Sequence, residues 1–426
     1  MARYEKYKDS GEQWLGQVPD HWDIIKGRGV FGENREKNDG TSDASVLSLS
    51  YGKIILKKDI DVGLVPADYK GYQIIKPDYI IIRCTDLQND KVSLRTGISK
   101  HFGMITSAYL GLIVKPGFNP DYMHYYLHTW DISKEIYRHG GGLRQVLSWN
   151  DIKYLSVLIP PKREQDRIVE YLDDACADID KAITQQQRMI DLLNERKQII
   201  IQNAVTKGLD PNVPMKDSGI DYIGEIPTSW KTKKIKYLAS YNDDSLSETT
   251  KKDCEIDYVE ISDVHFGQGI TNSTKYVFDE VSSRARRITR KGDIIISTVR
   301  TYLKAVAVVN KDGLIVSTGF MVIRPNLDMV DGRFMSYAVL ASSLINEVEK
   351  ISVGTSYPAV NAWQVADLKI AYPKSKDEQK RIANFLLKVE GDVENAIKRH
   401  SAIIELLKER KRIIINDVVT GKNKVS

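Results

Sequence analysis

Two clusters of polar residues follow two short apolar runs of this chain and have side chains that can contact nucleic acid. The runs are residues 79–84 and 293–298, and both are rich in isoleucine. An arginine can donate two hydrogen bonds to guanine, and Asn or Gln can pair with adenine in a similar two-point manner. Lysine and threonine suit phosphate oxygens. The candidates for DNA contact are Arg83, Thr85, Gln88, Asn89, Lys91 and Arg95 in the first cluster, and Thr298, Arg300, Tyr302 and Lys304 in the second.

A glycine-marked loop lies downstream of each cluster, at residues 140–145 and 354–358. Loops of this kind often carry binding residues on a rigid scaffold. Their polar members extend the candidate set with Arg144 and Gln145 in the first loop and with Thr355, Ser356 and Tyr357 in the second. Each residue alone could belong to an ordinary solvated loop. The recurrence of both clusters at equivalent places favours a binding role for the sets.

Motifs that could carry catalysis are incomplete. Residues 119–122, Asn-Pro-Asp-Tyr, resemble the Asn-Pro-Pro-Tyr motif with which adenine methyltransferases hold a flipped base, but the second proline is replaced by Asp121. His124 and His128 are four residues apart, yet the adjacent glutamate of a His-Glu-x-x-His zinc site is missing. No phosphate-binding Gly-x-x-x-x-Gly-Lys-Ser/Thr is present either. We therefore predict no catalytic residue, no metal site and no cofactor in this chain.

The elements that must position the two clusters are duplicated. Residues 8–22 and 216–230 align without a gap and share seven of fifteen residues, including Lys-Asp-Ser-Gly at the start and Trp at the end. Residues 164–206 and 378–420 share nineteen of forty-three. Between these blocks the two halves diverge. A repeated frame around two unlike inserts predicts a scaffold that holds two different binding domains.

The longer repeated blocks have the periodicity of a coiled coil. Apolar residues alternate at spacings of four and three over residues 168–203 and again over 382–417, which is a heptad pattern. Two amphipathic helices that each pack on their own domain are the alternative. The predicted seam residues are Ile168, Leu172, Ile179, Gln186, Leu193 and Ile200, and then Ile382, Leu386, Val393, His400, Leu407 and Ile414, with Ala175, Ala182, Met189, Val389, Ala396 and Ile403 between them.

Polar residues that interrupt the seam favour an antiparallel arrangement. In a parallel pair Arg196 would face Arg410, and two like charges in a nearly dry seam are costly. In an antiparallel pair each arginine meets a smaller apolar side chain, and Gln186 faces His400. The third pair of interruptions is Asn203 and Asp417. Residues 168–203 would span ~53 Å as a helix, compared with ~34 Å for a turn of DNA. Such helices could space two binding domains by roughly one to one and a half turns.

Composition limits the remaining possibilities. The chain has 426 residues, a net charge of +5 and three cysteines. This length predicts two or more domains, and the charge permits a polyanionic partner without requiring one. The odd number of cysteines excludes a disulfide framework of paired residues. The polar N-terminus and the lack of a long apolar run predict a cytoplasmic protein without membrane contact.

Together these patterns predict an α+β fold with a pseudo-two-fold internal repeat, in which two α+β domains are separated by two long helices that form an antiparallel coiled coil. We place the first domain at residues 1–160, the first helix at 161–208, the second domain at 209–373 and the second helix at 374–426. The aromatic stretches at 122–137 and 334–348 are predicted to be helical, with their aromatic side chains in the core.

The repeated motifs resemble those of specificity subunits of type I restriction-modification systems. The resemblance rests on the motif that opens each half and on Pro-x-x-Glu-Gln-x-x-Ile at residues 161–168, and it covers essentially the whole chain. The second copy is slightly longer between Pro373 and Glu378.

The resemblance implies a non-catalytic subunit with two target recognition domains, each of which reads one half of a gapped site in double-stranded DNA. It also implies two methyltransferase subunits that use S-adenosylmethionine and two restriction subunits that use ATP and Mg²⁺. Residues 195–197 and 409–411 would be candidates for methyltransferase contact. The alternative from another class is a coiled-coil scaffold with two adaptor domains and no role with nucleic acid.

Overall fold

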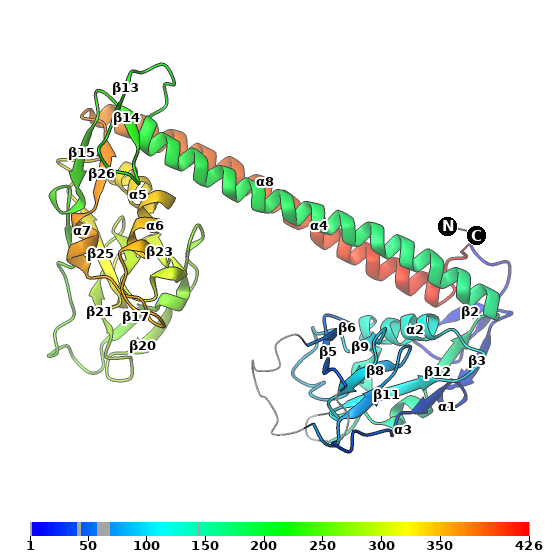
Figure 1. The fold of residues 1–426 in the computed structure, drawn as a ribbon. Coiled ribbons are helices and arrows are strands. Elements are labelled where there is room, and N and C mark those ends of the chain that lie inside the picture. Colours follow the sequence, from blue (N-terminus) through cyan, green and yellow to red (C-terminus); the bar gives the residue numbers. More distant parts are fainter. Residues whose placement is uncertain (1, 41–43, 58–68, 143–144, 426) are drawn as a thin grey trace. The chain divides into compact units, whose positions relative to one another are not determined.

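The computed structural model describes residues 2–40, 44–57, 69–142 and 145–425. The chain divides into two compact units, unit 1 with Met1–Gln186 and Ala402–Ser426, and unit 2 with Gln187–Ser401. Each unit combines β-sheets with helices (Figure 1), which confirms the α+β class. The long helices α4 (Lys162–Lys207) and α8 (Lys376–Val419) each contribute one half to each unit.

Unit 1 is built around an antiparallel sheet with strand order β4-β11-β8-β9. Successive side chains of a strand point to opposite faces, so β8 serves two cores. Ile80 and Ile82 pack in the core with helix α2, and Ile81 packs in the core with the β5–β6 hairpin. The smaller elements are β1 (Tyr7–Asp9), β2 (Gln17–Pro19), β3 (Asp23–Lys26), α1 (Gly27–Val30), β4 (Phe31–Glu33), β5 (Leu47–Ser50), β6 (Lys53–Leu56), β7 (Gln73–Ile75), β8 (Ile80–Arg83), β9 (Thr96–Ile98), β10 (Gly103–Ile105), β11 (Tyr109–Val114), α2 (Pro120–Ile132), η1 (Glu135–Arg138), α3 (Trp149–Lys153) and β12 (Ser156–Ile159).

Unit 2 repeats this plan with the sheet β16-β25-β22-β23, and β22 again divides its isoleucines between two cores. A second sheet, β20-β17-β24-β21, contains the parallel pair β17 and β24. The elements are β13 (Met215–Asp217), β14 (Glu225–Pro227), β15 (Lys231–Lys234), η2 (Ile235–Tyr237), β16 (Ala239–Tyr241), β17 (Glu255–Val259), η3 (Ile261–Asp263), β18 (Val264–His265), β19 (Gly269–Ile270), β20 (Thr274–Val277), β21 (Ala285–Ile288), β22 (Ile294–Ser297), η4 (Thr301–Leu303), β23 (Val306–Val308), β24 (Leu314–Ser317), β25 (Phe320–Pro325), α5 (Gly332–Leu340), α6 (Ser342–Lys350), α7 (Ala362–Asp367) and β26 (Lys369–Tyr372).

The aromatic stretches are helical and buried, as predicted. Tyr122, Tyr126 and Trp130 of α2 are fully buried, and Phe334 of α5 is fully buried in unit 2. The motif at residues 119–122 has a structural role, because the Asn119 side chain caps α2 by accepting hydrogen bonds from the backbone N–H groups of Asp121 and Tyr122, at 2.9 and 3.1 Å.

Both ends of the helix pair close a domain core. In unit 1, Ile168 and Leu172 of α4 are buried together with Val418 and Val419 of α8. In unit 2, Ile201, Ala204 and Val205 of α4 are buried with Ile382, Ala383 and Leu386 of α8. The start of one helix therefore packs beside the end of the other in each unit, which confirms the antiparallel arrangement.

The seam of the helix pair differs from the prediction at five positions. The predicted positions Met189 and Ile403 are exposed, and the following residues Ile190 and Ile404 are more buried. Arg196 and Arg410 are also exposed, while Lys197 is buried and Lys411 forms an ion pair with Asp180 at 2.7 Å. Asn203 is exposed as well, and its neighbour Ala204 is buried. The antiparallel orientation was thus predicted correctly from arginines that lie outside the seam.

The remaining seam candidates are buried or half-buried. Ile168, Leu172, Ile179, Ile382, Leu386 and Val393 are buried, and Gln186, Leu193, Ile200, His400, Leu407 and Ile414 are half-buried. Also half-buried are the other members of the alternate series to which the five exposed positions belong, Ala175, Ala182, Val389, Ala396 and Asp417.

The repeated Glu-Gln pair ties each long helix to its domain. Gln165 is buried, accepts a hydrogen bond from the Asn119 backbone N–H at 2.9 Å and donates one to the Pro160 carbonyl at 2.8 Å. Gln379 makes the equivalent bonds to Asp331 and Pro373, at 2.7 and 2.8 Å. Each glutamine therefore joins the cap of a domain helix to the end of a strand.

The opening motif of each half packs against the end of a long helix. Trp230 lies beside Gly208, which follows α4, and Trp22 lies beside Gly421, which follows α8. Gly421 has φ +73°, and a Cβ there would lie 2.3 Å from a side-chain atom of Pro19, so both its backbone and its surroundings require glycine. The N-terminal segment therefore completes the end of α8 in unit 1, and the two chain ends lie close together (Figure 1).

Burial of two histidines predicts that unit 1 loses stability in acid. Burial lowers the pKa of His124 to about 4 and that of His128 to about 3, against 6.5 in an unfolded chain. Between pH 6.5 and 4 the unfolded chain therefore binds protons that the folded unit cannot bind, and stability falls as the pH decreases. Asp131 partly offsets this loss: burial raises the pKa of its carboxyl group to about 6, so the folded unit binds this proton more readily than the unfolded chain and gains stability as the pH falls. We expect unit 1 to lose about 2 kcal/mol between pH 7 and pH 5, measured by hydrogen exchange resolved along the chain.

Unit 2 is the internal control for this measurement, since its histidines are the exposed His265 and the half-buried His400. In the double variant His124→Gln/His128→Gln, the loss in unit 1 should disappear. An equal loss of protection in both units of the unchanged protein would contradict the assignment to these histidines.

Candidate nucleic-acid interface

The structure brings the two predicted loops of unit 1 together. The loop after β8 (residues 84–94) contacts the glycine-marked loop through backbone hydrogen bonds from the Leu147 N–H to the Cys84 carbonyl, at 3.0 Å, and from the Leu87 N–H to the Gln145 carbonyl, at 3.4 Å. Side chains from both loops are thereby presented by one continuous surface. Arg144, one of the candidates, lies outside the described residues.

Four candidates in unit 1 remain available to a ligand. Gln88, Asn89 and Lys91 are exposed, and Thr85 is half-buried. Asn89 donates a hydrogen bond to the Asp86 carboxylate at 2.7 Å, which orients its amide. These side chains match the types that contact adenine and phosphate.

Three further candidates in unit 1 are engaged within the protein. Arg95 is fully buried, and its guanidinium is surrounded by backbone carbonyls, so it cannot reach a ligand and is removed from the contact set. Gln145 donates to the carbonyls of Tyr137 and His139, at 2.6 and 2.8 Å, and holds its own loop. Arg83 pairs with Asp90 at 3.0 Å. Hydrogen bonds, first of all from the Ser93 backbone N–H, lower the pKa of Asp90 to about 2.

Unit 2 joins its two predicted loops in the same way. The Arg300 N–H donates to the Pro358 carbonyl at 2.7 Å, and the Val360 N–H donates to the Thr298 carbonyl at 2.9 Å. The Arg300 guanidinium lies 4.9 Å from the centre of the Tyr357 ring, so a cation stacks on an aromatic face at the surface. Tyr302 and Tyr357 are about half and two-thirds exposed, and Thr355 and Ser356 are exposed beside them.

The other candidates in unit 2 have internal partners. The Thr298 hydroxyl donates to the Gly319 carbonyl at 2.9 Å. The Lys304 ammonium contacts Asn346 at 2.9 Å and Glu349 at 3.3 Å. Arg300 and Lys304 both have positive φ, at 51° and 49°, on either side of the short turn η4. A non-glycine residue in this region costs roughly 1–3 kcal/mol, and such strain is often found at functional sites.

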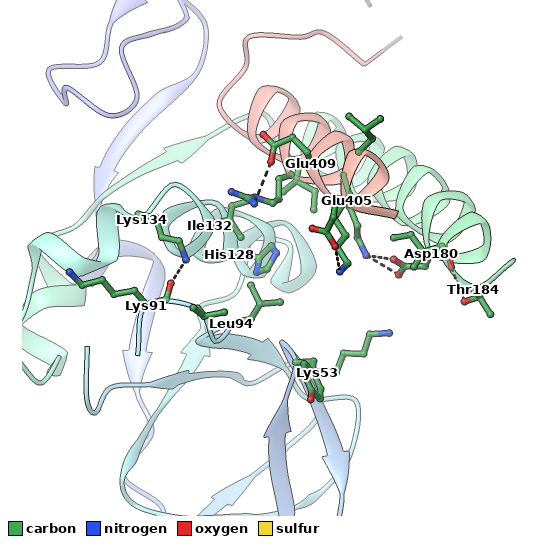
Figure 2. A pocket seen from close by; sticks show the side chains of 18 of the residues that line it. Lys53, Lys91, Leu94, His128, Ile132, Lys134, Asp180, Thr184, Glu405 and Glu409 are labelled. Carbon is green, nitrogen blue, oxygen red and sulfur yellow. Dashed lines mark hydrogen bonds and ion pairs between the residues drawn. The ribbon is translucent and has the colours of Figure 1, made fainter. Parts of the chain in front are cut away.

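A cleft of about 1320 Å³ lies in unit 1 between the first domain and the helix pair (Figure 2). One wall is formed by Tyr51, Lys53, Lys91 and Val92, together with Leu94. The other wall belongs to α4 and α8, and its charged residues pair among themselves as Asp180 with Lys411, Glu405 with Lys408, and Glu409 with Arg412. Lys53 and Lys91 make no ion pair with any described residue. The first wall therefore suits an anionic ligand.

Tyr51 was missed by the sequence analysis. It is 93% exposed at the tip of the β5–β6 hairpin, and both Tyr51 and Gly52 have positive φ, as a two-residue type I′ turn requires. The Tyr-Gly pair between the apolar runs 47–49 and 54–56 was the available signal. Tyr51 lines the same cleft as Lys53 and Lys91.

A second apolar stripe lies on the exposed side of each long helix. In α4 it consists of Met189, Leu192 and Ile199, which are 44%, 40% and 53% exposed. In α8 it consists of Ile403, Leu406 and Ile413, which are 41%, 70% and 49% exposed. These residues occupy equivalent positions of the internal repeat. Repeated exposed apolar side chains at helical spacing are typical of a protein-binding surface.

The described residues contain no group of three or more His, Cys, Asp or Glu side chains placed to hold a metal ion. His128 instead lies within hydrogen-bond distance of the Thr96 hydroxyl, at 3.3 Å. Among the described helices, none is long and apolar enough to cross a membrane.

Comparisons with known proteins point to one family. Residues 227–401 match the family described as the type I restriction modification DNA specificity domain. The chain is 25% identical over 281 residues to the type I restriction enzyme MjaVIII specificity subunit of Methanocaldococcus jannaschii, a match that covers 64% of this chain and 63% of that protein. A second protein of this organism, assigned as the MjaX specificity subunit, is 24% identical over 100% of this chain and 99% of its own length.

A solved structure supports the fold. One chain in a structure that concerns complex assembly and conformational transition of the type I R-M system superposes with a TM-score of 0.62 at 15% identity. The superposition covers 94% of this chain and 98% of that one.

Proposed function

We infer that this chain, which belongs to the family of type I restriction-modification specificity subunits, reads a gapped DNA site with two target recognition domains, one for each half-site. It is the non-catalytic component of its complex, and its place is the cytoplasm. The proposal rests on the combination of equivalent sheets with different loops. The sheet β4-β11-β8-β9 of unit 1 corresponds to β16-β25-β22-β23 of unit 2. The loops that follow β8 and β22, residues 84–94 and 298–304, differ in length and composition.

The exposed side chains of the joined loops are suited to DNA. In the first domain the amides of Gln88 and Asn89 could pair with a base, and Lys91 could contact phosphate. In the second domain Arg300 stacks on Tyr357, and both residues are exposed, as is Tyr302. We propose that α4 and α8, with 46 and 44 residues, set the gap between the half-sites.

The exposed stripes of α4 and α8 support a complex with two methyltransferase subunits. Because the two stripes are equivalent in the repeat, two copies of one partner could bind by the same contacts. Of the residues expected to meet this partner, Glu195, Arg196, Glu409 and Arg410 are exposed, whereas Lys197 and Lys411 belong to the interior of the helix pair. We further propose that the partners carry the chemistry: S-adenosylmethionine on the methyltransferase subunits, and ATP with Mg²⁺ on two restriction subunits.

Exchange of residues 23–155 for the corresponding segment of another specificity subunit should change one half of the methylated motif and leave the other half and the gap unchanged. Genome-wide mapping of N6-methyladenine in the host, with and without the gene, measures both halves at once. A protein-interaction scaffold without a role with DNA would leave the methylation pattern unchanged on deletion. A simultaneous change in both half-sites would contradict the assignment of one reader to each half.

Replacement of Arg300 should weaken DNA binding more than replacement of Lys304, because Lys304 is already paired within the protein and the Arg300 guanidinium is stacked at the surface. We expect Arg300→Ala to cost about 1–3 kcal/mol on a cognate duplex. Lys304→Ala should cost less than about 0.5 kcal/mol, because the half-buried Lys304 ammonium already contacts Glu349 and Asn346, and a partly exposed ion pair of this kind contributes little. Titration of the assembled methyltransferase with duplexes at several salt concentrations gives both values, and equal losses would argue against this arrangement.

Charge placed in the apolar stripes should reduce the number of bound methyltransferase subunits. We expect Leu192→Asp or Leu406→Asp to weaken one site by at least about 2 kcal/mol, through lost apolar burial and a desolvated charge. Each single variant should then bind one methyltransferase subunit and the double variant none, as measured by native mass spectrometry. Lys181→Asp and Asn395→Asp, at another pair of equivalent exposed positions, are the matched controls and should retain two.

A further inference from the structure

Arg95 is a fully buried arginine whose five side-chain donors all have partners within unit 1, four of them carbonyls of the segment 83–90. Its guanidinium donates to the carbonyls of Arg83 at 3.3 Å, Thr85 at 2.8 Å and Asp86 at 3.0 Å, and also to the carbonyl of Asp90. The fifth donor, Nε, contacts the Tyr137 hydroxyl at 3.2 Å. An arginine has five N–H donors, so none is left for a ligand.

The four carbonyls belong to the segment 83–90, which carries the exposed Gln88 and Asn89. Leu87 is the one fully buried side chain of the loop 84–94 apart from Cys84, and few apolar contacts therefore hold the loop in shape. Hydrogen bonds from the guanidinium to backbone carbonyls, and not apolar packing, therefore hold this loop in its conformation. Its own position is set from the domain, because the Arg95 backbone N–H donates to the Asp131 carboxylate of α2 at 2.5 Å.

Unit 2 shows what the arginine is needed for. The Arg83 N–H donates to the Arg95 carbonyl at 2.8 Å, and the Ser297 N–H donates to the Ala305 carbonyl at 2.8 Å, so Ala305 is the equivalent residue. The loop between these residues is 84–94 in unit 1 and 298–304 in unit 2, four residues shorter. The shorter loop closes as the turn η4 and leaves a buried alanine where the longer one surrounds a guanidinium.

We propose that Arg95 is the positioning residue that determines base specificity in the first target recognition domain. Its hydrogen bonds fix the backbone of residues 83–90, and the exposed side chains of Gln88 and Asn89 are thereby held in a single conformation toward the solvent. The proposal rests on the proposed function, since it requires that this loop reads DNA. Two-point hydrogen bonding to a base edge depends on placement within about 0.5 Å, so a loop without its internal support should still bind DNA but discriminate poorly.

The test uses the assembled methyltransferase with Arg95→Lys and Arg95→Met, and duplexes that carry single substitutions in either half-site. A lysine has three donors and can replace only part of the set, so we expect at least a threefold loss of discrimination in the first half-site for Arg95→Lys and at least tenfold for Arg95→Met. Discrimination in the second half-site should stay within twofold for both. The ratio of methylation rates on cognate and substituted duplexes is the readout.

Met123→Ala is the matched control, because Met123 is fully buried in α2 of the same domain and lies outside the loop. Urea unfolding measures how far each variant lowers stability. If Met123→Ala reduces discrimination in the first half-site as much as Arg95→Met, or if Arg95→Met leaves that discrimination intact, the positioning role is wrong. If the unchanged protein discriminates at neither half-site, the proposed function itself fails, and the two failures are thereby distinguished.

Discussion

The structure depends on one constraint: neither domain core is complete without both long helices. Ile168 and Leu172 at the start of α4 are buried with Val418 and Val419 at the end of α8. At the other end of the pair, Ile201, Ala204 and Val205 are buried with Ile382, Ala383 and Leu386. Each core therefore needs the beginning of one helix and the end of the other, and only an antiparallel pair supplies this. The motifs shared by the two halves serve the same junctions. Gln165 and Gln379 bind the caps of α2 and α5, and Trp22 and Trp230 pack where α8 and α4 end.

Within this shared frame, the halves differ in the loops and in the second sheet, which is the four-stranded β20-β17-β24-β21 in unit 2 and is replaced by the pairs β5-β6 and β10-β7 in unit 1. The residues that repeat are those that make the junctions, where burial and paired hydrogen bonds leave little freedom. Among the residues that differ are those of the loops at the end of β8 and β22, where backbone hydrogen bonds fix the chain but leave the outward side chains free to vary. The two loops are also stabilised differently. In unit 1 the buried Arg95 guanidinium bonds the loop after β8, and in unit 2 a shorter loop closes as the turn η4, with positive φ at Arg300 and Lys304. Under the proposed function, a change of loop residues in one half would leave the contacts of the helix pair in place.

The helix pair itself has two apolar sides. One side forms the seam and the other carries the exposed stripes of Met189, Leu192 and Ile199 and of Ile403, Leu406 and Ile413. Exposed leucine and isoleucine at equivalent places in both copies are unfavourable in isolation. Their recurrence supports the proposal that two copies of one partner bind the helix pair.

Much of this protein could be predicted from its sequence because its signals are periodic or repeated. Heptads over 168–203 and 382–417 predicted the long helices, the duplicated motifs predicted two equivalent halves, and the isoleucine runs predicted β8 and β22. What the sequence could not decide was which of two neighbouring apolar stripes forms the seam. Met189 and Ile190 are equally apolar, and only packing against α8 separates them.

The same limit applies to the candidate interface. Arg95 and Lys91 are both basic residues in a polar loop, and their sequence context does not distinguish them. In the folded chain Arg95 is buried and Lys91 is exposed. The difference arises because four carbonyls of residues 83–90 surround the Arg95 guanidinium, an arrangement that forms only when the loop is folded. Residue type and spacing thus determined the elements and the chemistry available to them. Tertiary structure alone decided which side chains the protein uses for itself and which it leaves for a ligand.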